Sequence, residues 1–133
     1  MTTSVVNVSL KMSLQITPAE LELMKVLWRK PGLGASEVFD ALENDRDWNI
    51  RTVKTLLSRL VEKGALETVQ DGRRFLYSPA VEKGTYQKKA AGQFVDRLFG
   101  GRAAPLIAQL ADARGLSEDD IEELEALLGR LKK

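Results

Sequence analysis

Cysteine and histidine are both absent from the 133 residues of this chain. The lack of cysteine excludes disulfide bonds, thiolate metal sites and cysteine nucleophiles. The lack of histidine removes a common metal ligand and the commonest general base of enzymes. We therefore expect no bound metal, no other cofactor and no enzymatic activity, because the remaining carboxylates and lysines form no recognisable catalytic motif.

Long hydrophobic runs are missing as well. The first residues interleave Asn7, Ser9 and Lys11 with apolar side chains, so no uninterrupted stretch reaches the length of a signal-peptide core or a membrane span. We interpret residues 1–15 as a flexible N-terminal arm. The chain is expected to be cytoplasmic and to bind no membrane.

The net charge of +1 conceals an uneven distribution of charged residues. Residues 17–47 contain seven acidic and four basic side chains, whereas residues 48–79 contain six basic and three acidic ones. A locally basic element at the surface can bind a polyanion even when the whole chain is nearly neutral. The segment 48–79 is therefore the first candidate for a binding surface.

Capping residues and apolar periodicity predict three helices in the first half of the chain. The first begins at the sequence TPAE, in which Thr17 caps the helix and Glu20 completes a capping box. A short second helix is expected around residues 35–43. The third starts at Asn49, a favourable cap, and ends before Gly64, which suits the left-handed position after a helix.

A β-hairpin is predicted after the third helix, over residues 66–79. The pair Asp71-Gly72 is typical of a two-residue hairpin loop, and β-branched and aromatic residues flank it. The aromatic residues expected in the core are Trp28, Trp48 and Phe75. Three helices followed by a hairpin is the order of a winged helix-turn-helix domain, which we assign to residues 16–80. The fold class is therefore mainly α with a small β-hairpin wing.

The third helix, residues 49–63, has two nearly opposite faces. Its apolar residues form one stripe that can be buried, while its polar residues stand clear of that stripe. The polar set comprises Arg51, Thr52, Lys54, Thr55, Ser58 and Arg59. These side chains can donate hydrogen bonds to phosphates or base edges, and no acidic residue precedes Glu62 on this face. We predict a recognition helix for duplex DNA, and the alternative is an ordinary solvated face.

Two consecutive arginines, Arg73 and Arg74, lie in the predicted wing. A wing beside a recognition helix can reach the neighbouring DNA backbone or minor groove, so we predict that both arginines contact DNA. Alternatively, they protect an exposed hairpin edge from pairing with another strand. The sequence ranks neither arginine above the other.

Three further helices are predicted in residues 81–133. Their apolar residues stay exposed unless another surface covers them, and a second copy of the chain provides that cover with two-fold symmetry. The predicted dimerisation residues are Phe94, Leu98, Phe99, Leu106, Ile107, Leu110, Ile121, Leu124 and Leu128. Two recognition helices related by that axis require a palindromic DNA site. The alternative is a monomer whose last helices pack back on the winged domain.

Four segments resemble the penicillinase repressor family (BlaI/MecI/CopY type) of bacterial winged-helix transcriptional regulators. They are ITPAELELMKVLW, WNIRTVKTLLSRLVEKGAL, GRRFLYSP and LSEDDIEELEALL, and they occur in the family's order. The resemblance implies a homodimeric repressor whose winged domain binds inverted-repeat operators and whose C-terminal helices hold the dimer together. It also implies operator contacts for Arg51, Thr52, Lys54 and Thr55 and a basic position at Arg59.

The resemblance further suggests how repression is relieved. In family members of the β-lactam-resistance type, a metalloprotease sensor system cuts the first dimerisation helix before a phenylalanine, and the matching bond here joins Gln93 and Phe94. The usual residue before that phenylalanine is asparagine, so Gln93 departs from the pattern. The copper-responsive branch uses a C-terminal cysteine cluster, which this chain lacks. A separate hypothesis is a winged-helix module that binds proteins and no DNA.

Overall fold

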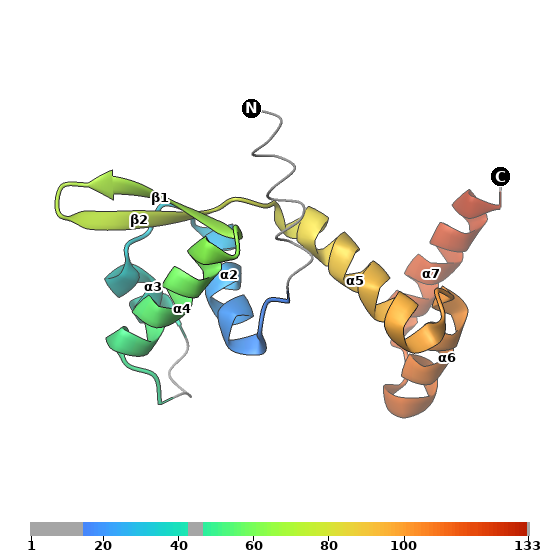
Figure 1. Ribbon diagram of the computed structural model, residues 1–133. Coiled ribbons are helices and arrows are strands. Elements are labelled where there is room, and N and C mark those ends of the chain that lie inside the picture. Colours follow the sequence, from blue (N-terminus) through green and yellow to red (C-terminus); the bar gives the residue numbers. More distant parts are fainter. Residues whose placement is uncertain (1–14, 43–46, 133) are drawn as a thin grey trace. The chain divides into compact units, whose positions relative to one another are not determined.

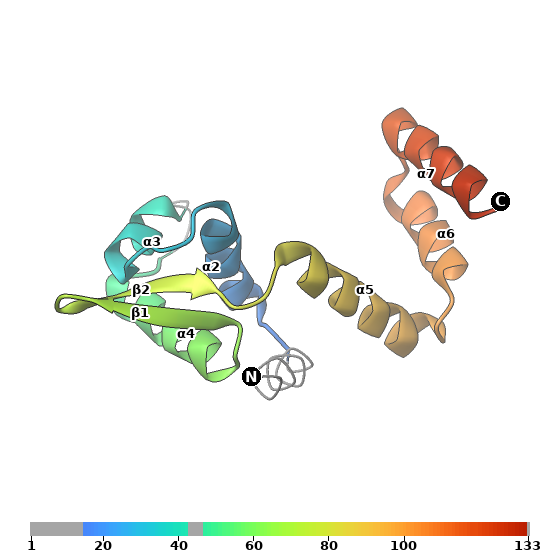
Figure 2. The same cartoon turned by 90° about the horizontal axis from the view of Figure 1, so that it is seen from above.

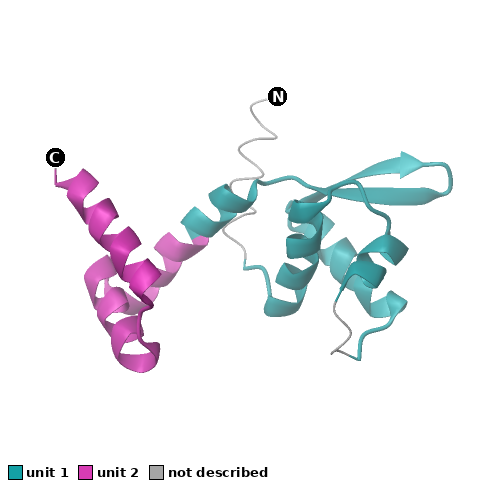
Figure 3. Ribbon diagram, turned by 180° about the vertical axis from the view of Figure 1, so that it is seen from behind, with its two compact units in different colours: residues 1–89 teal, residues 90–133 magenta. Residues whose placement is uncertain are grey.

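The structure, a computed structural model, describes residues 15–42 and 47–132 (Figure 1). The expected arm, residues 1–15, therefore lies outside the described residues except for Gln15. The chain divides into two compact units, residues 1–89 and 90–133 (Figure 3). Our expected domain boundary after residue 80 stays a prediction.

The first helix, α2 (Pro18–Arg29), begins with the capping box that the sequence predicts. The hydroxyl of Thr17 accepts a hydrogen bond from the backbone N–H of Glu20 at 3.1 Å, and the Glu20 carboxylate accepts one from the backbone N–H of Thr17 at 2.9 Å. This exchange satisfies two of the backbone donors that a helix start leaves without partners.

The helix-turn-helix consists of α3 (Ala35–Ala41) and α4 (Ile50–Glu62). α3 stops short of residue 43, which itself lies outside the described residues. The side chain of Asn49 accepts a hydrogen bond from the backbone N–H of Thr52 at 2.9 Å, which confirms the predicted cap of α4. Beyond α4, Gly64 has a φ of 84°, a left-handed conformation that favours glycine, so the predicted helix end is confirmed as well.

The wing is an antiparallel hairpin of β1 (Leu66–Asp71) and β2 (Arg74–Pro79). Asp71 pairs with Arg74, so the two-residue loop is Gly72-Arg73, and our prediction of Asp71-Gly72 is wrong by one position. Gly72 has a φ of 64°, and every residue with a positive φ in the described ranges is a glycine. Glycine at the first loop position is the arrangement of a type II′ turn, and it places Arg73 at the tip of the wing.

The core of the first unit lies where α2, α3 and α4 meet. Its fully buried apolar side chains include Leu23, Met24, Leu27, Val38, Val53, Leu57 and Leu60. β1 packs on α4, and β2 packs on α2 and α3 (Figures 1 and 2). The backbone N–H of Tyr77 in β2 donates to the carbonyl of Leu33 at 2.8 Å. The hairpin is thereby held beside the helix-turn-helix.

The two tryptophans are predicted to lie in the core, and both pack against it as half-buried side chains. The indole N–H of Trp28 donates to the carbonyl of Val81 at 2.9 Å, and its ring centre lies 5.7 Å from that of Tyr86. These contacts attach the chain that follows the wing to α2.

The remaining helices are α5 (Lys83–Phe99), α6 (Ala103–Arg114) and α7 (Glu118–Leu131). α5 contributes residues to both units, because the division falls between residues 89 and 90. The hydroxyl of Ser117 accepts a hydrogen bond from the backbone N–H of Asp120 at 3.0 Å and so caps α7. No helix in the described part of the chain is long and apolar enough to cross a membrane.

Candidate nucleic-acid interface

The two faces of α4 separate as helical periodicity predicts. Val53, Leu57 and Leu60 lie in the core. Of the α4 residues predicted to contact DNA, the exposed ones are Arg51, Lys54, Thr55, Ser58 and Arg59, and Thr52 is half-buried. α4 therefore presents a polar surface to solvent while its apolar stripe anchors it.

Three cationic side chains on this surface have no partner in the described part of the chain. No ion pair or hydrogen bond engages the side chain of Arg51, Lys54 or Arg59. The first turn of α4 contains no acidic residue, and Glu62 lies at the far end of the helix. The positive end of the helix dipole lies at the same end as Arg51 and Lys54. The N-terminal half of α4 is therefore a surface that attracts anions.

The two threonines of this surface are held by the helix itself. The hydroxyl of Thr52 donates to the side-chain oxygen of Asn49 at 3.3 Å, and the hydroxyl of Thr55 donates to the backbone carbonyl of Arg51 at 3.1 Å. Each hydroxyl has thereby committed its single proton and keeps its lone pairs and its neighbouring methyl group for other contacts. In this conformation neither threonine can donate a hydrogen bond to a phosphate.

The structure separates the two wing arginines, which the sequence left equivalent. Arg73 lies in the exposed loop, and its side chain makes no ion pair or hydrogen bond with any described residue. Arg74 is the first residue of β2, and its Nη1 lies 3.5 Å from Oε1 of Glu37 in α3. Arg73 is therefore the wing arginine that is free to meet a partner.

A shallow groove separates α4 from the wing. It has a volume of about 310 Å³ and is lined by Ser58, Val61, Glu62, Thr68, Phe75 and Tyr77. Phe75 is 50% exposed, so our expectation that it lies in the core is wrong. It belongs to the second residue pair from the loop, opposite Gln70, and lines the groove beside α4 without being covered by it. The alternation of side chains along a strand predicts that Phe75 and Tyr77 lie on the same face of the hairpin. It does not predict how much of that face the helices cover.

The helices of the second unit expose many apolar side chains. No described residue of α5, α6 or α7 is buried. Of the predicted dimerisation residues, Phe94, Leu98, Ile107, Leu110, Ile121 and Leu128 are exposed, and Phe99, Leu106 and Leu124 are half-buried. Leu127 and Leu131 are exposed as well and extend the same apolar surface, although our prediction did not include them.

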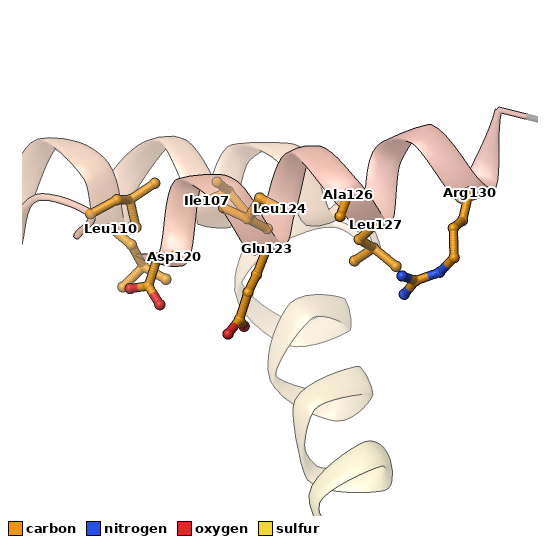
Figure 4. A pocket seen from close by; sticks show the side chains of 9 residues that line it. Ile107, Leu110, Asp120, Glu123, Leu124, Ala126, Leu127 and Arg130 are labelled. Atoms are coloured by element: carbon orange, nitrogen blue, oxygen red, sulfur yellow. The ribbon is translucent and has the colours of Figure 1, made fainter. Parts of the chain in front are cut away.

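Figure 4 shows a groove between α6 and α7. Its volume is about 550 Å³, and its lining residues are Ile107, Leu110, Leu116, Asp120, Glu123, Leu124, Ala126, Leu127 and Arg130. Most of these side chains are apolar. Since short helices with uncovered apolar faces are marginal in water, this surface requires a cover.

The bond between Gln93 and Phe94 lies inside α5. Gln93 is half-buried, and the ring of Phe94, which is 39% exposed, lies 6.1 Å from the ring of Phe99. Cleavage of a peptide bond within a folded helix requires that the helix open locally. The structure thus places this bond in the interior of a helix.

Comparison with known proteins connects both units to one family. A family model described as penicillinase repressor matches residues 16–130. The penicillinase repressor of Bacillus licheniformis is 33% identical over 114 residues, which cover 86% of this chain and 89% of that protein. The methicillin resistance regulatory protein MecI of Mammaliicoccus sciuri is 30% identical over 116 residues, which cover 87% of this chain and 94% of that protein.

Two solved structures are similar to about half of the chain. The solution structure of the DNA binding domain of the repressor BlaI is 40% identical, covers 52% of this chain and 84% of its own, and has a TM-score of 0.47. The solution structure of the Bacillus licheniformis BlaI monomeric form in complex with the blaP half-operator is 40% identical, covers 53% and 85%, and has a TM-score of 0.46.

Proposed function

This chain belongs to the penicillinase repressor family, and from that premise we propose that it is a transcriptional repressor that binds operator DNA through α4 and the wing. As a member of this family it is a regulator and not an enzyme. The observation that carries the DNA contacts is the set of unpartnered cations on the exposed face of α4, Arg51, Lys54 and Arg59. A polyanion is the partner that such a surface attracts.

The position of each cation suggests its role on DNA. Arg51 and Lys54 are assigned to base edges, because recognition helices read the major groove with their N-terminal residues. The guanidinium of Arg51 suits a bidentate pair with guanine. Arg59, further along the helix, and Arg73, at the wing tip, are assigned to phosphates. The uncharged side chains of Thr52, Thr55 and Ser58 are assigned to the remaining contacts between α4 and DNA.

The second unit is proposed to hold a homodimer. Its helices bury none of their described residues within one chain, and the groove between α6 and α7 is mostly apolar. A second copy covers such surfaces with two-fold symmetry. The dimer then binds a palindromic operator whose half-sites are about one helical turn, or a multiple of it, apart.

Repression is proposed to end when a sensor protease system cuts the chain between Gln93 and Phe94. The cut severs α5, so the winged unit loses its covalent link to most of the dimerising helices. Operator affinity then falls, because two half-sites are no longer engaged by one linked molecule. Since bacterial operator DNA lies in the cytoplasm, the proposed site of action is that compartment.

Fluorescence anisotropy with labelled duplexes tests the proposed DNA binding. The probes are a duplex from the region upstream of the gene for this chain and a scrambled duplex of the same composition. We expect tighter binding to the upstream duplex and a steep loss of affinity between about 50 and 200 mM salt, because phosphate contacts release counterions. A wild-type chain that binds neither duplex would contradict the proposal.

A protein-binding winged helix is the second candidate, and the exposed Phe75 favours it. An aromatic side chain that lines a groove is a frequent anchor in protein interfaces. This candidate predicts a stable complex with another protein that duplex DNA does not displace and that Phe75→Ser abolishes. Binding of the upstream duplex that survives Phe75→Ser supports the repressor.

A further inference from the structure

The carboxylate of Glu37 connects three parts of the first unit. Its Oε1 accepts a hydrogen bond from the backbone N–H of Gly34 at 2.8 Å, at the start of α3. The same oxygen lies 3.5 Å from Nη1 of Arg74, at the start of β2. One side chain therefore links the segment before α3, α3 itself and the wing.

Gly34 leaves the space through which this contact is made. The residue is buried, and a Cβ added to it would lie 3.3 Å from Nη1 of Arg74, a tight contact. Its φ of −82° is open to any residue, so no left-handed backbone requires glycine here. Because glycine has no side chain, the guanidinium of Arg74 fits into the space beside Gly34.

Backbone hydrogen bonds attach β2 to the helices at a different point. The N–H of Gly32 donates to the carbonyl of Tyr77, and the N–H of Tyr77 donates to the carbonyl of Leu33, both at 2.8 Å. Towards the loop, Phe75 is half exposed. Among the described residues, the ion pair of Arg74 with Glu37 is the one polar side-chain contact that ties this end of the hairpin to the helices.

We propose that Arg74 positions the wing through Glu37, and that Arg73 alone of the two arginines neutralises a DNA phosphate. The inference rests on the proposed DNA binding. It assigns different roles to Arg73 and Arg74, which the sequence alone does not distinguish. The tie holds the loop end of the hairpin against α3, so Arg73 meets the DNA backbone at a set position relative to α4. Without the tie, the same phosphate contact forms, but the wing must be ordered during binding, which costs affinity.

The salt dependence of binding separates a positioning arginine from one that neutralises a phosphate. Arg73→Ala is expected to flatten the plot of log affinity against log salt by about 0.9 for each phosphate that is no longer neutralised. Arg74→Ala is expected to weaken binding to the upstream and the scrambled duplex alike, by about 1.5- to 5-fold, with an unchanged slope. Arg29→Ala, which removes an exposed arginine of α2, is the control for a change of charge alone. A slope that flattens in Arg74→Ala as it does in Arg73→Ala overturns the proposal, and so does unchanged affinity.

A double-mutant cycle tests whether Arg74 acts through Glu37. Glu37→Gln keeps an oxygen that can accept from the N–H of Gly34 and removes the negative charge that faces Arg74. We expect Arg74→Ala to weaken binding in the wild-type background and to have no further effect beside Glu37→Gln. An equal decrease in affinity in both backgrounds shows that Arg74 contacts DNA independently, which contradicts the proposal.

Gly34→Ala gives a third measurement that removes no charge. The added methyl group lies 3.3 Å from Nη1 of Arg74, so the guanidinium must move by a few tenths of an ångström, and we expect slightly weaker binding with an unchanged salt slope. Thermal unfolding of every variant shows whether the fold is retained. A wild-type chain that binds neither duplex refutes the proposed function and this inference together, whereas wild-type binding with flattened slopes in both arginine variants refutes this inference alone.

Discussion

Lys63 and Glu20 form an ion pair that joins the end of α4 to the start of α2. The ammonium of Lys63 lies 2.5 Å from Oε1 of Glu20 and also donates to the backbone carbonyl of Gln15 at 2.8 Å. Glu20 is 1% exposed, and its carboxylate also accepts the N–H of Thr17. The pair therefore fixes the C-terminal end of the proposed recognition helix against the first helix.

The state of Glu20 predicts how stability depends on pH. Burial raises the pKa of this carboxyl group, but hydrogen bonds from Lys63 and Thr17 and the charge of Lys63 outweigh burial, so the pKa lies below its usual 4.5. A carboxylate with a lowered folded-state pKa stabilises the fold above its unfolded pKa, and this stabilisation is lost as the pH falls through the folded pKa. We predict that the advantage of the wild-type chain over Glu20→Gln, measured by urea denaturation, shrinks as the pH falls below 4.5. An advantage that does not change with pH would refute this account.

Removal of Lys63 should be costly at neutral pH. Lys63→Met leaves the buried carboxylate of Glu20 without its cation, and we predict a decrease of about 1–3 kcal/mol in the free energy of unfolding. Adding Glu20→Gln should recover part of this decrease, because a neutral amide needs no counter-charge. The control is Lys25→Met, whose partner Glu22 is 3.6 Å away on the surface of α2, and it should cost less than about 1 kcal/mol. Equal costs for the two lysines would contradict the assigned role of the pair.

The features that the sequence predicted correctly are those set by near neighbours. The Thr17 capping box, the Asn49 cap and the end of α4 at Gly64 each depend on residues within one turn of helix. The ion pairs that Lys63 and Arg74 form depend on partners that are distant in sequence, and no local pattern reveals such partners.

The wing illustrates the same limit. Its strands and its loop region follow from Gly72 and from the flanking β-branched and aromatic residues. The exposure of Phe75 depends instead on how much of the hairpin the helices cover, which is a property of the packed unit. For the same reason the different environments of Arg73 and Arg74 could not be read from the sequence.

Arg51 and Arg59 should have different effects on DNA binding. Arg51→Ala is predicted to reduce the preference for the upstream over the scrambled duplex by about 1–3 kcal/mol, because it removes a base contact. Arg59→Ala should weaken binding to both duplexes to the same extent and flatten the salt slope, because it removes a phosphate contact. The two duplexes are compared by anisotropy at one salt concentration and then over a salt series. Equal weakening on both duplexes for Arg51→Ala would exclude it from base reading.

The proposed dimer depends on the apolar surface of α7. Sedimentation equilibrium at micromolar concentration should give about twice the 14.8 kDa of one chain. Leu128 is 54% exposed in one chain, so Leu128→Glu should leave each chain folded but place a charge in the covered surface and shift the mass towards the monomer. Glu125→Gln, on the same helix, is the matched control and should remain dimeric. A wild-type chain that sediments as a monomer would exclude the dimer.

Access to the Gln93–Phe94 bond should depend on how stable α5 is at this bond, and Gly92, the residue before Gln93, lowers that stability. A Cβ added at Gly92 meets nothing within 4 Å, so Gly92→Ala should stabilise α5 by about 0.5–1 kcal/mol through helix propensity alone. If the bond is reached by local opening, amide exchange at Phe94 and cleavage nearby should slow by about 2- to 5-fold. Gly84→Ala is the control, since it is also unobstructed but lies at the start of α5. Equal slowing by both variants would indicate that the whole of α5 opens as one segment, and no slowing by Gly92→Ala would show that helix opening does not limit access.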